Sequence, residues 1–301
     1  MQRVGVLAMA YGTPLDRADI AAYYTDIRRG HPPSEEQLAA LVARYDAIGG
    51  TFPLREITDA QLDRLQAALD ALSPEGFTVV LGTKHSSPSI TDGVAALAAD
   101  GISRAVGLVL APHWSTVSVG QYAAQAAAAG DAHGVDVETV PSWHLLPAYV
   151  DFIADAVADA LADVPGAEVV FTAHSVPVRV VTMGDPYPDQ VRETAEAVAA
   201  RAQLTSWSVG WQSAGRTADP WLGPDVLDLV RDRAAAGAAG LVVCACGFTA
   251  DHLEVAYDLD IEAAALARDV GLPFARTRSV NADAGVMSAL ADVVSRASPL
   301  P

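Results

Sequence analysis

The chain has 301 residues, of which 51% are hydrophobic, so it is long enough for two modest domains or one large α/β unit. Its formal net charge of −18 argues against nucleic acid as a partner, because phosphate binding requires clustered lysine and arginine. No apolar run reaches the roughly 18–20 residues that a membrane span needs, and the N-terminal stretch reads as a buried strand rather than a signal peptide; we therefore expect a cytoplasmic protein.

Short apolar runs alternate along the chain with longer stretches of helical periodicity. The apolar runs predict strands at residues 4–10, 77–83, 105–112, 167–174, 207–212 and 239–246. The periodic stretches predict helices at residues 34–48, 57–72, 90–101, 149–164 and 189–202. Because the strands are apolar almost throughout, they are expected to be buried on both faces in parallel sheets flanked by helices. The predicted fold class is doubly wound α/β.

The stretch VPSWHLLPAYV, at residues 140–150, lies near the midpoint, with three predicted strands before it and three after it. We therefore expect two similar α/β halves, residues 1–145 and 146–284, with a cleft between them. A C-terminal helix at about residues 285–300 is expected to pack back on the first half. In such sheets, ligands bind beyond the carboxyl ends of the strands. The polar residues that end or follow predicted strands are Tyr11, Lys84, His85, His113, His174 and Glu254.

The stretch DHLEVAYDLDIE, which runs from Asp251 to Glu262, follows the last predicted strand. Its acids Glu254, Asp258 and Glu262 recur every four residues and are expected to lie on one helix face, where like charges repel. A row of carboxylates beside His252 is suited to a divalent metal, which the row could pass along a helix. The alternative is a solvated surface face.

Other candidate residues also have ordinary structural explanations. A histidine at a strand end, such as His174, is more often structural than catalytic, and Tyr11 considered alone is more often a packing residue. Arg28 and Arg29, at an expected helix end, either complement the helix dipole or hold carboxylates through paired hydrogen bonds. The sequence contains no nucleophile elbow, zinc-finger spacing, His-Glu-x-x-His helix or dinucleotide fingerprint.

Taken together, nine segments resemble the ferrochelatase family, in particular its short soluble bacterial members that act on coproporphyrin. The segments occur in the family's order and span nearly the whole chain. They are VLAMAYGTP, YYTDIRRG, RYDAIGG, LGTKHSSP, VLAPHWSTVSVGQY, FTAHSVP, GDPYPDQV, VGWQSAGRTADPWLGPDV and GFTADHLEVAYDLDIE.

The resemblance implies two Rossmann-like domains with a porphyrin in the cleft between them. It implies a lyase that inserts Fe(II) into coproporphyrin III to give coproheme in haem biosynthesis, with loss of two pyrrole protons. Two other activities stay open, namely a chelatase for protoporphyrin IX or another tetrapyrrole, and a non-catalytic haem-binding protein on the same fold.

The resemblance also implies roles for the candidate residues. His174 and Glu254 are the expected catalytic and metal-binding pair, and Asp258, Glu262 and His85 complete the expected metal ligands. A neutral imidazole with a pKa near 6.5 can accept a pyrrole proton at neutral pH, and a carboxylate can assist it. Which of His174 and Glu254 takes protons and which guides the metal stays open.

Coproporphyrin carries four propionates, which need polar partners. In the coproporphyrin branch, a tyrosine at the position of Tyr11 faces the ring on the side opposite the histidine and glutamate. The expected porphyrin-binding residues are Tyr11, Arg28, Arg29, Arg44, Tyr45, Thr51 and Tyr122. Thr51-Phe52 departs from the family pattern, because relatives often have a serine that contacts a propionate there. His31-Pro32 is a second departure, at a place where a basic residue is common.

Some bacterial ferrochelatases carry a [2Fe–2S] cluster on four cysteines, but this chain has only Cys244 and Cys246. Two thiolates cannot complete that ligation within one chain, so we expect no cluster and no cofactor beyond the substrate iron. At positions i and i+2 of a strand, both sulfurs would point to one face, as a relic of such a site. The expected partners are porphyrin, Fe(II) and, transiently, neighbouring haem-pathway enzymes, for a chain that acts as a monomer.

Overall fold

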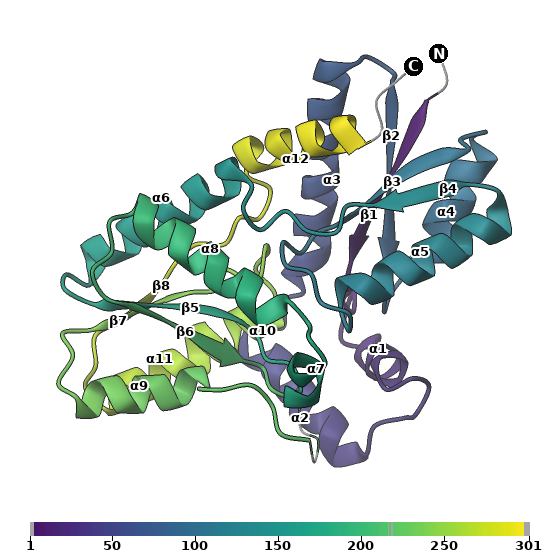
Figure 1. Ribbon diagram of the computed structural model, residues 1–301. Helices are drawn as coiled ribbons and strands as arrows, with labels where there is room; N and C mark the ends of the chain where they lie inside the picture. The colour runs from purple at the N-terminus through teal and green to yellow at the C-terminus, as the bar shows by residue number, and fades with distance from the viewer. Residues whose placement is uncertain (1–2, 216, 218, 298–301) are drawn as a thin grey trace. The chain divides into compact units, whose positions relative to one another are not determined.

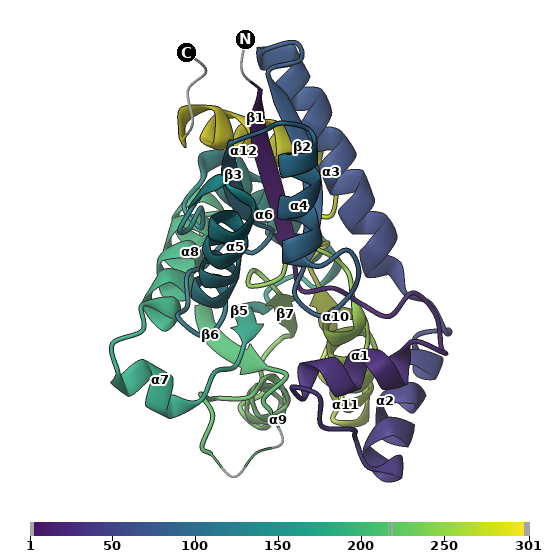
Figure 2. The ribbon, with the colours of Figure 1, turned by 90° about the vertical axis from the view of Figure 1, so that its right-hand side faces the viewer.

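The computed structural model describes residues 3–215, 217 and 219–297, and it forms two units (Figures 1 and 2). The first unit comprises residues 3–111, 117–142 and 281–297, and the second comprises residues 112–116 with the described part of 143–280. The predicted ranges, 1–145 and 146–284, differ from these units mainly in Pro112–Thr116, which belongs to the second unit. Residues 1–2 and 298–300 of the predicted ranges lie outside the described residues, as do Arg216 and Ala218 of the motif SAGRTADPW.

The first unit is built on a parallel sheet, which in the described part of the chain has four strands in the order β2-β1-β3-β4. The strands are β1 (Val4–Ala10), β2 (Phe77–Thr83), β3 (Arg104–Val109) and β4 (Asp136–Thr139). The first three correspond to predicted apolar runs. The sequence did not predict β4, because this edge strand, DVET, has exposed and half-buried positions and therefore lacks an apolar run.

Among the described residues, four helices cover the faces of this sheet: α3 (Pro53–Leu72), α4 (Ile90–Ala99), α5 (Val119–His133) and α12 (Ala284–Ala297). Two more described helices of this unit, α1 (Ile20–Ile27) and α2 (Glu35–Ala47), contact each other. Ser34 and Ser89 begin α2 and α4 with capping boxes, and Pro53 occupies the first turn of α3, where its missing N–H is not needed. Figure 1 shows α4 and α5 on one side of the sheet and α3 and α12 on the other, and α12 packs against α3.

The second unit repeats this plan on another parallel sheet, with four strands in its described residues and the order β6-β5-β7-β8. The strands are β5 (Glu168–His174), β6 (Trp207–Gln212), β7 (Leu241–Cys244) and β8 (Phe274–Arg276). Only three residues long and half-buried, β8 carries no sequence signal for a strand. The predicted doubly wound α/β class, with two parallel sheets flanked by helices, is confirmed.

The helices of the second unit are α6 (Pro147–Asp163), α7 (Val178–Thr182), α8 (Tyr187–Arg201), α9 (Val226–Ala235), α10 (Leu253–Ala256) and α11 (Ala264–Asp269), with a π-helical turn η1 (Asp258–Ala263) between α10 and α11. In Figure 1, α6 and α8 lie over one face of the sheet, and α9 and α11 lie over the other. No helix within the described ranges is both long enough and apolar enough to cross a membrane.

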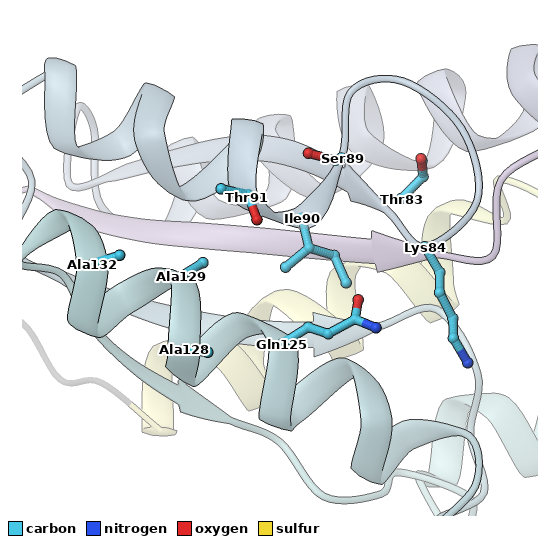
Figure 3. Close-up of a pocket in the computed structure, with 9 residues that line it drawn as sticks. All are labelled: Thr83, Lys84, Ser89, Ile90, Thr91, Gln125, Ala128, Ala129 and Ala132. Atoms are coloured by element: carbon cyan, nitrogen blue, oxygen red, sulfur yellow. The ribbon is translucent and has the colours of Figure 1, made fainter. Parts of the chain in front are cut away.

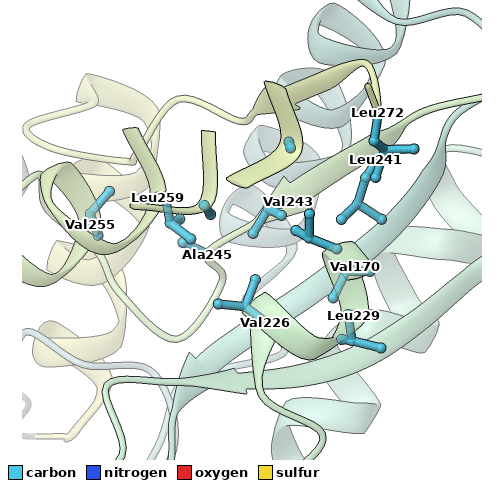
Figure 4. Close-up of a cluster of buried hydrophobic side chains, with 12 residues drawn as sticks. Val170, Val226, Leu229, Leu241, Val243, Ala245, Val255, Leu259 and Leu272 are labelled. Carbon is cyan, nitrogen blue, oxygen red and sulfur yellow. The ribbon is translucent and has the colours of Figure 1, made fainter. Parts of the chain in front are cut away.

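A cluster of buried hydrophobic side chains in the second unit packs η1 against the sheet (Figure 4). Leu259 in η1 is fully buried, in a cluster that also contains Val170 of β5, Val243 of β7 and Leu229 of α9. Burying a leucine of this kind contributes about 1.5–3 kcal/mol, so the cluster holds one side of the acidic segment firmly in place. The backbone that carries the neighbouring carboxylate of Asp258 is therefore held in a fixed position against the core.

Candidate active site

Three chain segments of the second unit converge at the carboxyl ends of its strands. His174 is the last residue of β5, Gln212 is the last residue of β6, and Glu254 lies in α10, after β7. Because parallel strands end at the same edge of a sheet, their last residues meet there. The Glu254 carboxylate lies between two imidazoles, with Oε1 3.6 Å from His174 Nε2 and Oε2 3.6 Å from His252 Nε2.

Backbone contacts set the orientation of both imidazoles. His174 Nδ1–H donates to the carbonyl of Ser175 at 2.6 Å, and His252 Nδ1–H donates to the carbonyl of Ala250 at 3.0 Å. Because Nδ1 is engaged in this way, each ring faces Glu254 with its other nitrogen, Nε2. The two rings therefore present the same nitrogen to one carboxylate, and either nitrogen can carry or release a proton there.

Two further features bring Glu254 to this position. Gln212, which is fully buried, donates from Nε2 to the backbone carbonyl of Glu254 at 2.9 Å, and its Oε1 accepts from Thr172 Oγ1 at 2.9 Å. Gly247 lets the loop after β7 pass close to β5, because a Cβ added there would lie 2.4 Å from the Cβ of Ala173. Any larger residue would push this loop away from His174.

The ion pair changes the pKa values of both catalytic candidates. Burial by itself would lower the pKa of His174, but the charge of Glu254 overcomes it, with help from Asp258, and raises the pKa to about 9. Burial would raise the pKa of Glu254, but His174 and His252 instead hold it well below its usual range. The expectation of a neutral His174 with an ordinary pKa of 6.5 is therefore wrong, because the adjacent carboxylate stabilises the imidazolium.

The acidic row does not continue as one regular α-helix. Between Glu254 and Glu262, the chain passes through η1, where Glu262 N–H donates to the carbonyl of Tyr257 at 2.9 Å in a π-type bond. Glu254 is 36% exposed, Asp258 is buried and accepts from Ser213 Oγ at 2.5 Å, and Glu262 is exposed. A purely solvated face would leave Asp258 in water, so its burial disfavours that alternative. π-helical turns of this kind are rare and occur often at functional sites.

His85 and Tyr11 lie together in the first unit. Their ring centroids are 4.6 Å apart in an edge-on arrangement, and His85 Nδ1 is 2.7 Å from a carboxylate oxygen of Asp26. Burial lowers the pKa of His85, although Asp26 opposes the shift, so the ring is neutral and can offer Nε2 to a metal. Among the described residues there is no group of three or more His, Cys, Asp or Glu side chains that could hold a metal. Ligation by His85 with Asp258 and Glu262, which belong to the other unit, stays a prediction.

The residues predicted to contact propionates include three arginines at or near helix ends and two buried tyrosines. Arg28 follows α1, with Nε donating to the carbonyl of His31 at 3.2 Å, and Arg29 has a left-handed backbone with a φ of 57°. Arg44 lies in the last turn of α2. Tyr45 and Tyr122 are each only 4% exposed.

The rings of the two buried tyrosines have packing partners. The Tyr45 ring stacks on Phe52 with a centroid distance of 4.6 Å, and Lys84 Nζ is 5.4 Å from the Tyr122 ring centroid. Thr51, at the position where relatives often have a serine, is exposed and donates from Oγ1 to the carbonyl of Ile48 at 3.2 Å. These residues have structural roles whether or not they also bind propionates.

Not every residue that follows a strand belongs to a site. His113, which comes soon after β3, is 2% exposed, and its Nε2 makes a 2.8 Å hydrogen bond with Thr194 Oγ1 inside the second unit. Burial, with a smaller contribution from His144, lowers its pKa to about 3. His113 is therefore a neutral core residue, and the structural explanation applies to it.

A pocket of about 340 Å³ lies in the first unit between the start of α4 and one side of α5 (Figure 3). In the close-up, Ile90 and Gln125 extend toward each other across it, and Ala128, Ala129 and Ala132 form its wall on α5. Lys84, which follows β2, lines it, but none of the residues predicted to bind metal or porphyrin does. We therefore assign it no part in the chemistry of His174 and Glu254.

The cysteines correct one sequence-based expectation. The predicted strand at 239–246 ends at Cys244, because Cys246 N–H donates back to the Cys244 carbonyl at 2.8 Å in a tight turn. Cys246 therefore does not share a strand face with Cys244. Both thiols are free and buried, and contact with Cys244 together with burial raises the pKa of Cys246 well above its usual value.

Sequence reasoning placed His174 and Glu254 in the site and set His252 beside the acidic row, but it missed two residues that act on Glu254 or its segment. Gln212 had a signal, since it ends a predicted strand, but glutamine rarely attracts attention as a functional residue. Arg276 lies on β8, which was not predicted.

The family model and the curated relatives agree on one family. A family model described as ferrochelatase matches residues 3–298. The coproporphyrin III ferrochelatase of Halalkalibacterium halodurans is 42% identical, over 98% of this chain and 97% of that protein. The coproporphyrin III ferrochelatase of Bacillus subtilis is 43% identical, over 97% of each chain. A sirohydrochlorin chelatase from Bacillus subtilis subspecies spizizenii, solved with cobalt, shares the fold with a TM-score of 0.56, at 12% identity over 98% of this chain and 94% of that chain.

Proposed function

Because the chain belongs to the ferrochelatase family, we propose that it inserts Fe(II) into coproporphyrin III to give coproheme, with release of two pyrrole protons. The observation that carries the proposal is the Glu254 carboxylate set between the imidazoles of His174 and His252 at the strand ends of the second unit. The relatives named for this activity align over almost the whole chain, which supports the substrate assignment.

The pair formed by His174 and Glu254 suits a reaction in which metal enters as protons leave. While Glu254 is ionised and unmetallated, it keeps His174 protonated at neutral pH, and an imidazolium cannot accept a pyrrole proton. An Fe(II) ion that reaches the Glu254 carboxylate neutralises its negative charge. The imidazolium of His174 then loses the partner that stabilises it, so the pKa of His174 falls and the ring releases its proton. His174 then becomes a base at the moment when iron is present, and His252 is a second group able to take a proton.

The acidic row provides a route for the iron. Glu262 is exposed, Asp258 is buried, and Glu254 contacts the histidines, so the row runs from solvent toward the proposed reaction site. Carboxylate oxygens can replace the water ligands of Fe(II) one at a time, which avoids a single large dehydration step. In this proposal, Asp258 passes iron to Glu254, and His85 contributes as an additional ligand.

The propionates are assigned to the first unit. Arg28, Arg29 and Arg44 can hold carboxylates in charge-assisted pairs, and the hydroxyls of Tyr11, Tyr45, Thr51 and Tyr122 can donate to them. A porphyrin with two propionates would leave part of this polar set facing vinyl groups. Buried polar groups left unpaired penalise the wrong ligand, so the proposal predicts a preference for the porphyrin with four propionates.

The test is Fe(II) insertion into coproporphyrin III and protoporphyrin IX, measured anaerobically with the purified full chain and monodisperse substrates. Each unpaired polar partner costs about 1–3 kcal/mol, so kcat/KM should favour coproporphyrin III by about tenfold or more. Equal kcat/KM values would refute the substrate assignment. Tight binding of coproheme without insertion into either porphyrin would instead identify a haem-binding protein.

A further inference from the structure

Arg276, the last residue of β8, joins the two ends of the segment that carries Glu254. Its Nε and Nη2 donate to the two carboxylate oxygens of Asp260 at 2.6 and 2.9 Å, and its Nη1 lies 3.1 Å from Asp251 Oδ1. Asp251 also accepts from Ser279 Oγ at 2.8 Å. Asp251 precedes His252, and Asp260 lies inside η1, so the two contacts bracket Glu254 and Asp258.

The geometry of these contacts is suited to holding backbone in place. The Arg276 side chain is 20% exposed, and its planar fork meets Asp260 through two parallel hydrogen bonds, an arrangement that lysine cannot reproduce. Nη1 also donates to the backbone carbonyl of Thr277 at 3.1 Å, which restricts the guanidinium itself. The buried side chain of Leu259 anchors η1 to the core, and the adjacent Asp260 is held by Arg276.

The same contacts divide the acids of the segment into two groups. Between Asp251 and Glu262 there are five carboxylates, and Arg276 pairs with two of them, Asp251 and Asp260. A carboxylate neutralised in this way is a poor metal ligand, because a cation would have to displace the guanidinium. The acids that do not pair with Arg276 are the proposed iron path, Glu254, Asp258 and Glu262.

We infer that Arg276 is a positioning residue for iron delivery: it fixes both ends of the Asp251–Asp260 segment and keeps those two carboxylates from competing for iron. This inference rests on the proposed function. It assigns Arg276 no contact with porphyrin or iron. Its effect therefore appears in the handling of Fe(II), with porphyrin binding unchanged.

The test compares Arg276→Met, which keeps most of the apolar stem, with Arg276→Lys, which keeps the charge but not the fork. The matched control is Arg233→Met, because Arg233 makes a similar two-bond pair with Glu168, at 2.6 and 2.8 Å. Glu168 begins β5 whereas His174 ends it, so this pair lies at the far end of the strand from the site. Arg276→Met loses the partly buried ion pairs with Asp260 and Asp251, which adjoin the acidic row, whereas Arg233→Met loses a partly buried ion pair away from it.

Partners that orient metal ligands are worth about 10–100-fold in metal affinity or activity, so Arg276→Met should raise the KM for Fe(II) about tenfold. Arg276→Lys should lie between Arg276→Met and the native chain, and Arg233→Met should match the native chain. The dissociation constant for coproporphyrin III, from fluorescence titration, should be the same in all four proteins. Calorimetric titration with Fe(II) alone, under anaerobic conditions, should show the same order of affinities.

Each result decides something. An Arg276→Met chain that matches Arg233→Met in both the KM and the binding of Fe(II) overturns the inference. If Arg276→Met does not fold, Arg276→Lys carries the test, and a native KM for Fe(II) in that variant overturns it. If the native chain inserts iron into neither porphyrin, the proposed function fails. Weaker Fe(II) binding by Arg276→Met than by Arg233→Met would then still support the positioning role.

Discussion

Replacing Glu254 by glutamine tests whether its charge controls the protonation of His174. The substitution keeps the shape of the side chain and removes the negative charge 3.6 Å from His174 Nε2. At that distance the contact is an ion pair rather than a hydrogen bond, so charge is the property that matters. Because burial still lowers the pKa of His174, the glutamine variant should have a clearly less basic histidine.

The expected fall in the pKa of His174 follows from the strength of its interaction with Glu254. The pKa of His174 is raised from 6.5 to about 9, a net shift worth about 3 kcal/mol at about 1.36 kcal/mol per unit, and the Ser175 carbonyl and Asp258 add to the effect of Glu254. The side chains of His174 and Glu254 are 39% and 36% exposed, so water screens part of this energy. After that discount we expect a coupling of about 1.4 kcal/mol, which is a fall of about one unit in the pKa of His174.

The measurement is a titration of the imidazole signals by NMR on nitrogen-labelled protein. The chain has seven histidines, and the signal that is missing from His174→Ala assigns His174. The matched control is Glu262→Gln, which removes an exposed carboxylate from the same segment and should leave the pKa of His174 unchanged. A native pKa in the Glu254→Gln variant would refute the argument, because it would mean that another group stabilises the imidazolium.

The interaction between His174 and Glu254 also predicts how the stability of the fold depends on pH. The pKa of His174 is higher in the folded chain than in the unfolded chain, so the pair stabilises the fold fully below about pH 6.5 and loses this effect as the pH rises through about 9. The pKa of Glu254 is lowered, so the contribution is also lost in acid, below about pH 4.5. The difference in free energy of unfolding between the native chain and Glu254→Gln should therefore shrink from pH 6 to pH 10.

Three other substitutions test the remaining parts of the site. His174→Ala should abolish iron insertion while coproporphyrin III still binds, as measured by fluorescence titration, because the proposed role of His174 is toward the pyrrole protons. Asp258→Asn should raise the KM for Fe(II) severalfold, because the buried acid lies between the exposed Glu262 and Glu254 in the proposed path. Gln212→Leu leaves the Glu254 carbonyl and the Thr172 hydroxyl without their partner, and should lower the free energy of unfolding in urea by about 1–3 kcal/mol.

Each of these predictions has an outcome that would contradict it. Near-normal turnover by His174→Ala would show that the pyrrole protons leave through another group. An unchanged iron dependence in Asp258→Asn would leave that residue with a structural role, through its bond with Ser213. Native stability in Gln212→Leu would mean that water replaces the amide at a position that is fully buried here.

The sequence by itself predicted the α/β class and the strands that carry the site. Runs such as 167–174 are apolar almost throughout, which is the signature of strands buried on both faces, and the residues that follow them lie at the sheet edge where ligands bind. His174 and Glu254 could be selected by this local logic together with the resemblance. The four-residue spacing of Glu254, Asp258 and Glu262 was also visible without a structure.

The tertiary structure alone decided how these residues act on one another. His174 and Glu254 are 80 positions apart in the chain, and only their approach to 3.6 Å raises the pKa of the histidine to about 9. Arg276 contacts the acidic segment from β8, a three-residue strand that is too short to be predicted from an apolar run. Local patterns report which face of an element is buried, whereas charge coupling and desolvation depend on distances through space, and these are set only when distant segments pack together.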